Sequence, residues 1–143
     1  MNEADRDVAV HWVRLALGDL AVAERPGELS EAWNRVRAEH AQQAGEKALK
    51  AVIVLIGADP PKTHDLIELA RLAGPGEGLP GLVTPTRLAA LTDAASARYP
   101  DALDAAYTTD EVDSLHAAAA TIVNWARERV INAGAYASEL TPR

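Results

Sequence analysis

The chain has no cysteine, no phenylalanine and one methionine in 143 residues. The missing cysteine excludes disulfides, thiolate zinc sites, cysteine-ligated iron–sulfur clusters and a cysteine nucleophile. Long hydrophobic runs are missing too: the longest, residues 48–57, contains Lys50 and is far shorter than the ~20 residues that span a bilayer. The first five residues, MNEAD, are too polar for a signal peptide. We therefore expect a cytoplasmic protein with no membrane segment.

Basic residues are the minority charge: 14 Lys and Arg stand against 21 Asp and Glu, a formal net charge of −7. This balance disfavours sequence-independent nucleic-acid binding through phosphate neutralisation, although a local basic stripe remains compatible with it. The length, with 48% hydrophobic and 24% charged residues, is typical of one globular domain. We expect a single domain over residues 1–143.

Abundant alanine in long segments without glycine or proline favours helices. Apolar spacings of three and four predict a first helix that stops before Pro26 and a second over about residues 30–56. Thr63 is expected to cap a short third helix that ends at Gly74, and Thr84 a fourth that ends near residue 97.

A last helix is expected to open at Thr108, with Glu111 at the capping-box spacing. The sum is an all-α, up-and-down bundle of four to five helices. The glycines and prolines of residues 74–83 predict a surface loop, and residues 134–143 are expected to form a flexible C-terminal tail.

Polar side chains border the apolar face of the second predicted helix. At 100° per residue, six residues fall within an arc of roughly 80°: Val36, His40, Gln43, Lys47, Lys50 and Val54. This stripe is either a solvated flank whose lysine stems cover apolar surface or an anion or nucleotide site built from two ammonium groups and one imidazole. All three lysines of the chain lie within residues 47–62.

Asp19 lies in the middle of the apolar face of the first predicted helix. An unpaired buried carboxylate is costly, so this group must find a partner or raise its pKa. We expect a structural ion pair with Lys47 or Arg98. A catalytic role is the weaker alternative, because one acid without a placed partner makes no mechanism.

None of the four histidines stands four residues from another or in an HExxH motif, so we expect no metal site and no cofactor. His64 and Asp65 stand at a predicted helix start, where they serve either local capping or anion binding. Walker A and GxSxG motifs are missing, and no GxGxxG follows a predicted strand, because the one match, at residues 76–81, lies in the predicted loop. A nucleotide hydrolase, dehydrogenase or serine hydrolase is therefore not indicated.

Four segments, in order, resemble the HEPN family: WVRLALGDLAVA at residues 12–23, HAQQAGEKALKA at 40–51, THDL at 63–66 and ARYPD at 97–101. The resemblance spans roughly residues 5–132. It implies a helical bundle, usually a homodimer, and often a minimal nucleotidyltransferase partner encoded nearby. The stripe, the predicted helix start at His64 and Asp65 and the fourth of these segments together give the candidate nucleotide- or partner-binding residues: His40, Gln43, Lys47, Lys50, His64, Asp65, Arg98 and Tyr99.

Some HEPN proteins are metal-independent ribonucleases, often toxins, with an Arg-x(4–6)-His motif. The spacing occurs here as Arg6–His11 and Arg35–His40. About one such match is expected by chance, and Arg98 has no histidine four to six residues after it.

Our leading hypothesis is an HEPN module that is not catalytic alone. It binds a nucleotide, RNA or a nucleotidyltransferase partner through the stripe, within a two-component toxin–antitoxin type of system. One alternative is a ribonuclease toxin in which Arg35 holds phosphate and His40 acts as acid or base. The other is a purely structural dimerisation module.

Overall fold

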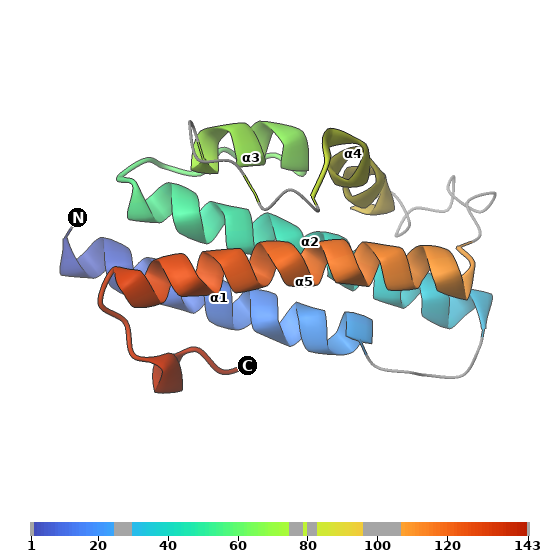
Figure 1. The fold of residues 1–143 in the computed structure, drawn as a ribbon, viewed down its shortest axis with the longest axis horizontal. Coiled ribbons are helices and arrows are strands. Elements are labelled where there is room, and N and C mark those ends of the chain that lie inside the picture. Colours follow the sequence, from blue (N-terminus) through green and yellow to red (C-terminus); the bar gives the residue numbers. More distant parts are fainter. Residues whose placement is uncertain (1, 25–29, 75–78, 80–82, 96–106, 143) are drawn as a thin grey trace.

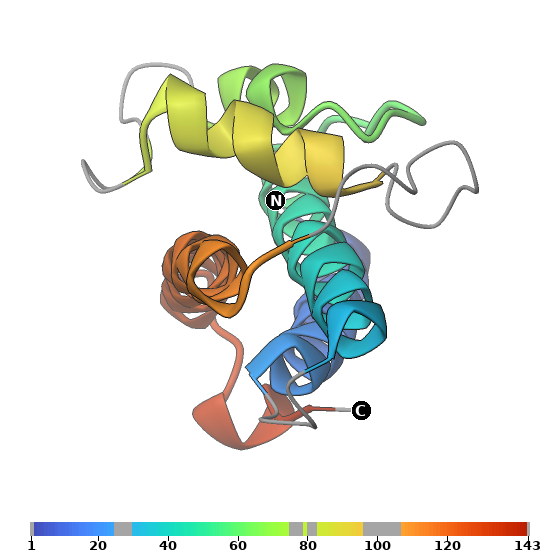
Figure 2. The same cartoon turned by 90° about the vertical axis from the view of Figure 1, so that its right-hand side faces the viewer.

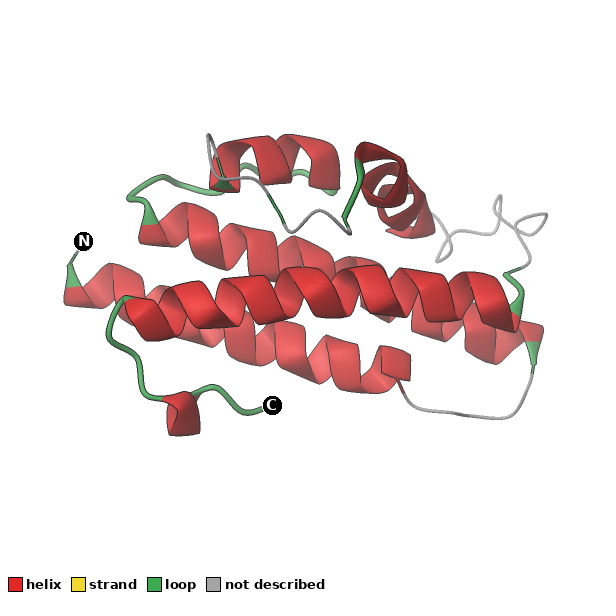
Figure 3. Ribbon diagram, in the orientation of Figure 1, coloured by secondary structure: helices red, strands yellow, loops and turns green. Residues whose placement is uncertain are grey.

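The computed structural model describes residues 2–24, 30–74, 79, 83–95 and 107–142 (Figure 1). Within these ranges the chain forms helices and no strand (Figure 3). The elements are α1 (Glu3–Glu24), α2 (Glu31–Leu55), α3 (Leu66–Ala73), α4 (Pro85–Asp93), α5 (Thr109–Asn132) and the 3-10 helix η3 (Ala137–Glu139). The predicted all-α bundle is confirmed. None of the described helices is long and apolar enough to cross a membrane.

Three long helices form the body of the bundle. α1 runs in one direction, and α2 and α5 run in the other (Figure 1). The short helices α3 and α4 lie over α2 on the side away from α1 (Figure 2). α2 is therefore the central helix, in contact with all four others.

The helix starts follow local capping. Ser30 and Thr84 each accept a backbone hydrogen bond, from Trp33 and Arg87 respectively. Thr108 is the expected N-cap of α5, because its Oγ1 accepts from the Glu111 amide. Its hydroxyl donates to the Glu111 carboxylate, whereas in a capping box that carboxylate accepts from the backbone amide of the N-cap residue.

The expected cap of the third helix is wrong. Asp65, not Thr63, is the N-cap of α3, and its carboxylate accepts from the amides of Ile67 and Glu68. The Thr63 hydroxyl oxygen instead accepts from the amide of Asp65, two residues further along the chain. A carboxylate also complements the positive N-terminal end of the helix better than a hydroxyl does.

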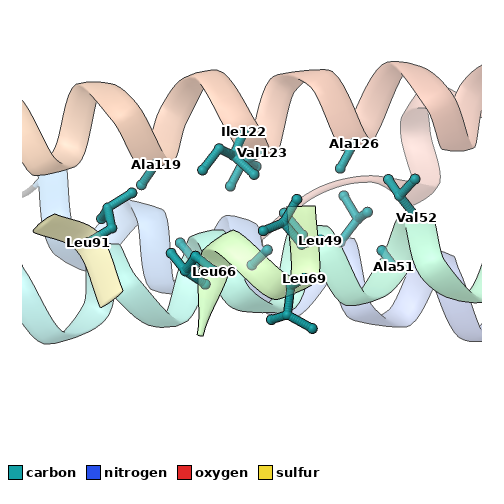
Figure 4. Packing of buried hydrophobic residues seen from close by; sticks show 14 of the residues in the cluster. Leu49, Ala51, Val52, Leu66, Leu69, Leu91, Ala119, Ile122, Val123 and Ala126 are labelled. Atoms are coloured by element: carbon teal, nitrogen blue, oxygen red, sulfur yellow. The ribbon is translucent and has the colours of Figure 1, made fainter. Parts of the chain in front are cut away.

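Large aliphatic side chains of different helices interlock in the core (Figure 4). Leu49, Leu66 and Ile122, from α2, α3 and α5, are fully buried. Alanines of the same helices are fully buried as well, among them Ala48, Ala119 and Ala126. A Cβ at Gly45 would stand 3.4 Å from Leu66 Cδ1 and 3.6 Å from Ile122 Cδ1, which is ordinary van der Waals contact.

The C-terminal residues differ from the expected flexible tail. Residues 137–139 form η3, and Ala135 and Leu140 are 6% and 3% exposed, so this segment packs on the bundle. Of the expected 74–83 loop, the structure describes Gly74, Leu79 and Val83. Arg98 and Tyr99 lie outside the described residues.

Arg37 ties the three long helices together. Its guanidinium is buried, with Nε donating to the Ala23 carbonyl at 2.7 Å and Nη2 to Asp113 Oδ1 at 2.8 Å. The Ala23 carbonyl belongs to the last turn of α1, where no helical amide remains to satisfy it. A residue of α2 thus satisfies a carbonyl in the last turn of α1 and forms an ion pair with α5.

Arg37→Met should destabilise the protein by about 2–4 kcal/mol, because it keeps the aliphatic stem but leaves a buried carbonyl without its charged donor. Asp113→Asn is the matched variant at the outer end of the same contact. The Asp113 side chain is 58% exposed, so that loss should stay below about 1 kcal/mol. Urea unfolding measures both, and equal losses would contradict this role of Arg37.

Candidate functional site

One narrow strip of α2 remains partly open to solvent between α1 and α3. Among residues 41–54, Gln43, Lys47 and Lys50 are the positions that are not buried. His40 continues this strip one turn earlier, with its side chain 31% exposed. We call these four residues the α2 seam. Asp19 of α1 contacts it on one side, and on the other His64, in the segment that leads into α3, contacts Glu46 of the same helix.

Asp19 of α1 forms the first cluster along the seam. Its side chain is 11% exposed and uses both oxygens: His40 Nδ1 lies 2.9 Å from Oδ1, and Lys47 Nζ lies 2.5 Å from Oδ2. Of the two expected partners, the structure places Lys47 here, while Arg98 lies outside the described residues. This carboxylate fixes two seam side chains against α1.

Glu46 of α2 forms the second cluster, on the α3 side. Its Oε1 accepts from Gln42 Nε2 at 3.0 Å and contacts His64 Nδ1 at 2.5 Å, and Lys50 Nζ lies 3.1 Å from Oε2. Burial alone would raise the pKa of Glu46. The hydrogen bonds from His64, Gln42 and Lys50 outweigh it, so the pKa lies below its ordinary value. Glu46 is thus held as a carboxylate.

The two clusters have the same chemistry. Each joins a buried carboxylate, a histidine and a lysine: Asp19, His40 and Lys47 in one, Glu46, His64 and Lys50 in the other. An ionised carboxylate accepts hydrogen bonds and does not donate them, so each neutral imidazole must carry its proton on Nδ1. Nε2 is then the acceptor nitrogen of each ring, and the His64 side chain is 60% exposed.

The seam lysines differ from the free cations expected of an anion site, because a carboxylate neutralises each of them. The Lys50 ammonium also lies 6.0 Å from the centre of the Trp12 ring. Each ammonium has three N–H groups. The salt bridge to its carboxylate uses one of them. Both side chains keep some exposure, 25% for Lys47 and 12% for Lys50.

Arg35 and His40 do not come together. Five residues along a helix turn by 500°, so the two side chains leave α2 about 140° apart. His40 meets Asp19 of α1, whereas the charge of Arg35 acts on Tyr107 at the approach to α5. The other Arg–His spacing has the same angular problem: Arg6 pairs with Glu3 at 3.8 Å, and His11 is exposed on α1.

The remaining candidates have local roles. Asp65 caps α3, and Gln43 donates to Glu39 Oε1 at 3.1 Å. Sequence reasoning missed Glu46, Gln42 and Trp12. The spacing of four residues from Gln42 to Glu46 and from Glu46 to Lys50 is visible in the sequence as a signal for helical side-chain pairs. The described residues hold no group of three or more His, Cys, Asp or Glu side chains placed to bind a metal ion.

The fold and the seam define an all-α helical module with two carboxylate–histidine–lysine clusters on its central helix. The family model described as "HEPN domain" matches residues 9–129, and the chain belongs to this family. No curated protein and no solved structure gives a significant match.

Glu46→Gln should flatten the fall in stability at acid pH. The folded pKa of Glu46 lies below its ordinary value of 4.5, so the carboxylate stabilises the fold fully above about pH 4.5 and loses that effect as pH falls through the folded pKa. We expect the free energy of unfolding of the wild type to exceed that of the variant by about 1–3 kcal/mol at pH 7. This difference should narrow below pH 4.5. Unfolding free energies measured from pH 7 to 3 test this, and a constant gap would contradict it.

Proposed function

We propose that this HEPN domain is a binding module that takes the phosphate of a nucleotide or of an RNA at the α2 seam and is not catalytic alone. The observation that carries the proposal is the arrangement of the two clusters. His40 and His64 flank Lys47 and Lys50, and each of the four side chains is held by a buried carboxylate. Donors that are fixed before a ligand arrives lose little conformational freedom when it binds.

Hydrogen-bond geometry, more than net charge, supports an anionic ligand here. The chain carries −7 overall, and each seam lysine is neutralised, so long-range attraction for a polyanion is weak. A phosphate that reaches the seam meets ammonium N–H groups and the His40 imidazole, and His64 shares the Glu46 carboxylate with Lys50. Each imidazole donates to phosphate through Nε2 when it is protonated. This favours a short contact with one phosphate or a few over wrapping of a long nucleic acid.

A protein partner is the second candidate, favoured by exposed apolar side chains beside the seam. Val36 lies on the same arc of α2 and is 36% exposed. Val8 of α1 is 47% exposed and stands one helical turn from Trp12. Such a mixed surface suits a minimal nucleotidyltransferase or a second copy of the chain, as the HEPN resemblance implies, within a cytoplasmic toxin–antitoxin type of system.

The ribonuclease alternative would need Arg35 and His40 to act from two different protomers, because within one chain they leave α2 on different sides. Metal-free cleavage of RNA by the purified protein, lost in both Arg35→Ala and His40→Ala, would establish it and contradict our proposal.

Lys50→Gln should weaken binding of adenosine monophosphate and of a 5′-phosphorylated ten-residue RNA at least tenfold, measured by calorimetry. The variant removes the positive charge of the ammonium and leaves the Glu46 carboxylate less compensated beside the phosphate. Arg71→Gln is the matched control, because it removes a cation from the Glu68 pair of α3, away from the seam. Its affinity should stay within twofold of wild type.

Two results would overturn the phosphate proposal: no binding of either probe by the wild type at millimolar concentration, or equal losses in Lys50→Gln and Arg71→Gln. Circular dichroism of each variant shows that the helices persist.

A further inference from the structure

A pocket lies between α4 and the first half of α5, and none of its lining residues belongs to the seam. The pocket has a volume of about 230 Å³, below the range of roughly 300–1,000 Å³ that is usual for drug-sized ligands. Small side chains hold it open: Ala90 on α4 and Ser114 and Ala118 on α5. Its size suits a ligand of one or two fused rings.

One wall of the pocket is apolar. Ala90, Leu115 and Ala118 line it, and the last two are 7% and 5% exposed. These aliphatic groups offer a continuous surface to a flat ring, and burial of such a ring is favourable in proportion to the apolar area removed from water.

The lining also holds a donor and an acceptor of opposite charge. The guanidinium of Arg87 only donates hydrogen bonds, and the carboxylate of Glu111 only accepts them. Thr108 engages Oε1 of Glu111 at 3.1 Å, which leaves Oε2 for a ligand. The two charges cancel, so an ionic ligand of either sign meets one repulsive group.

Tyr107 adds a neutral donor. Burial raises the pKa of its phenol, and the negative charges of Asp93 and Glu111 raise it further, against the opposing effect of Arg35. The hydroxyl therefore keeps its proton at physiological pH.

We propose that this pocket binds a small, uncharged planar heterocycle with a cyclic amide edge. The amide N–H donates to Glu111, the amide carbonyl accepts from Arg87, and the ring lies against the Ala90, Leu115 and Ala118 wall. The ligand is uncharged because Arg87 and Glu111 carry opposite charges, and its amide edge matches one donor and one acceptor, while its ring buries apolar area against Ala90, Leu115 and Ala118. The site does not depend on phosphate binding at the seam.

The test is a ¹H–¹⁵N NMR titration of the full chain with 2-quinolone, a bicyclic cyclic amide, and with quinoline, which lacks both the N–H and the carbonyl. We expect shifts centred on residues 87–90 and 107–118, and an affinity for 2-quinolone at least fivefold higher than for quinoline. Arg87→Met should bring 2-quinolone down to the affinity of quinoline.

Ser114→Leu fills the pocket from an exposed position and should lower the 2-quinolone affinity at least tenfold. Ala117→Leu adds the same side chain at an exposed position of α5 outside the pocket and should leave the affinity unchanged. Equal affinities for the two probes, shifts scattered over the surface, or a full response in Ser114→Leu would each overturn the proposal.

Discussion

Two carboxylates lie inside this bundle, and each must be satisfied by donors from other parts of the chain. The side chains of Asp19 and Glu46 are 11% and 12% exposed, and an unpaired buried charge costs several kcal/mol. Asp19 meets this demand with two residues of α2, which orients α1 against α2. Glu46 draws on His64, which holds the segment before α3 against the same helix. The placement of α1 and of the segment before α3 against α2 therefore depends on two acids.

The same contacts determine the chemistry of the surface. Each carboxylate accepts a hydrogen bond from the Nδ1–H group of a histidine and neutralises a lysine, so the seam presents positioned donors and acceptors with little net charge. A ligand must therefore be recognised by geometry at short range, which agrees with the acidic balance of the whole chain. Arg37 performs a similar task deeper in the bundle, where it satisfies the end of α1 and reaches Asp113 of α5.

Local patterns in the sequence predicted what depends on local physics. Apolar periodicity, glycine and proline positions and the Thr108–Glu111 spacing gave the helices, and four short segments gave the family. The acid in the apolar face of α1 signalled a buried pair. Lys47, one of the two partners expected for it, lies 28 residues further along the chain. The second cluster was not visible: nothing near His64 in the sequence points to Glu46, 18 residues earlier, as its partner.

The errors have physical causes as well. Thr63 and Asp65 both suit a helix cap, and the carboxylate took the position. Residues 134–142 are polar enough to suggest a free tail, yet Ala135 and Leu140 find apolar partners on the bundle. Arg35 and His40 matched a spacing in sequence, but a spacing of five on a helix separates two side chains instead of joining them.

The most direct test of the two-cluster account is the tautomer of each histidine ring, read from long-range ¹H–¹⁵N NMR couplings of the free protein above the pH at which the rings titrate. We predict that His40 and His64 both carry their proton on Nδ1, because Asp19 and Glu46 each accept a hydrogen bond from that nitrogen. A proton on Nε2 in either ring would mean that the corresponding carboxylate does not hold it, and would contradict the account.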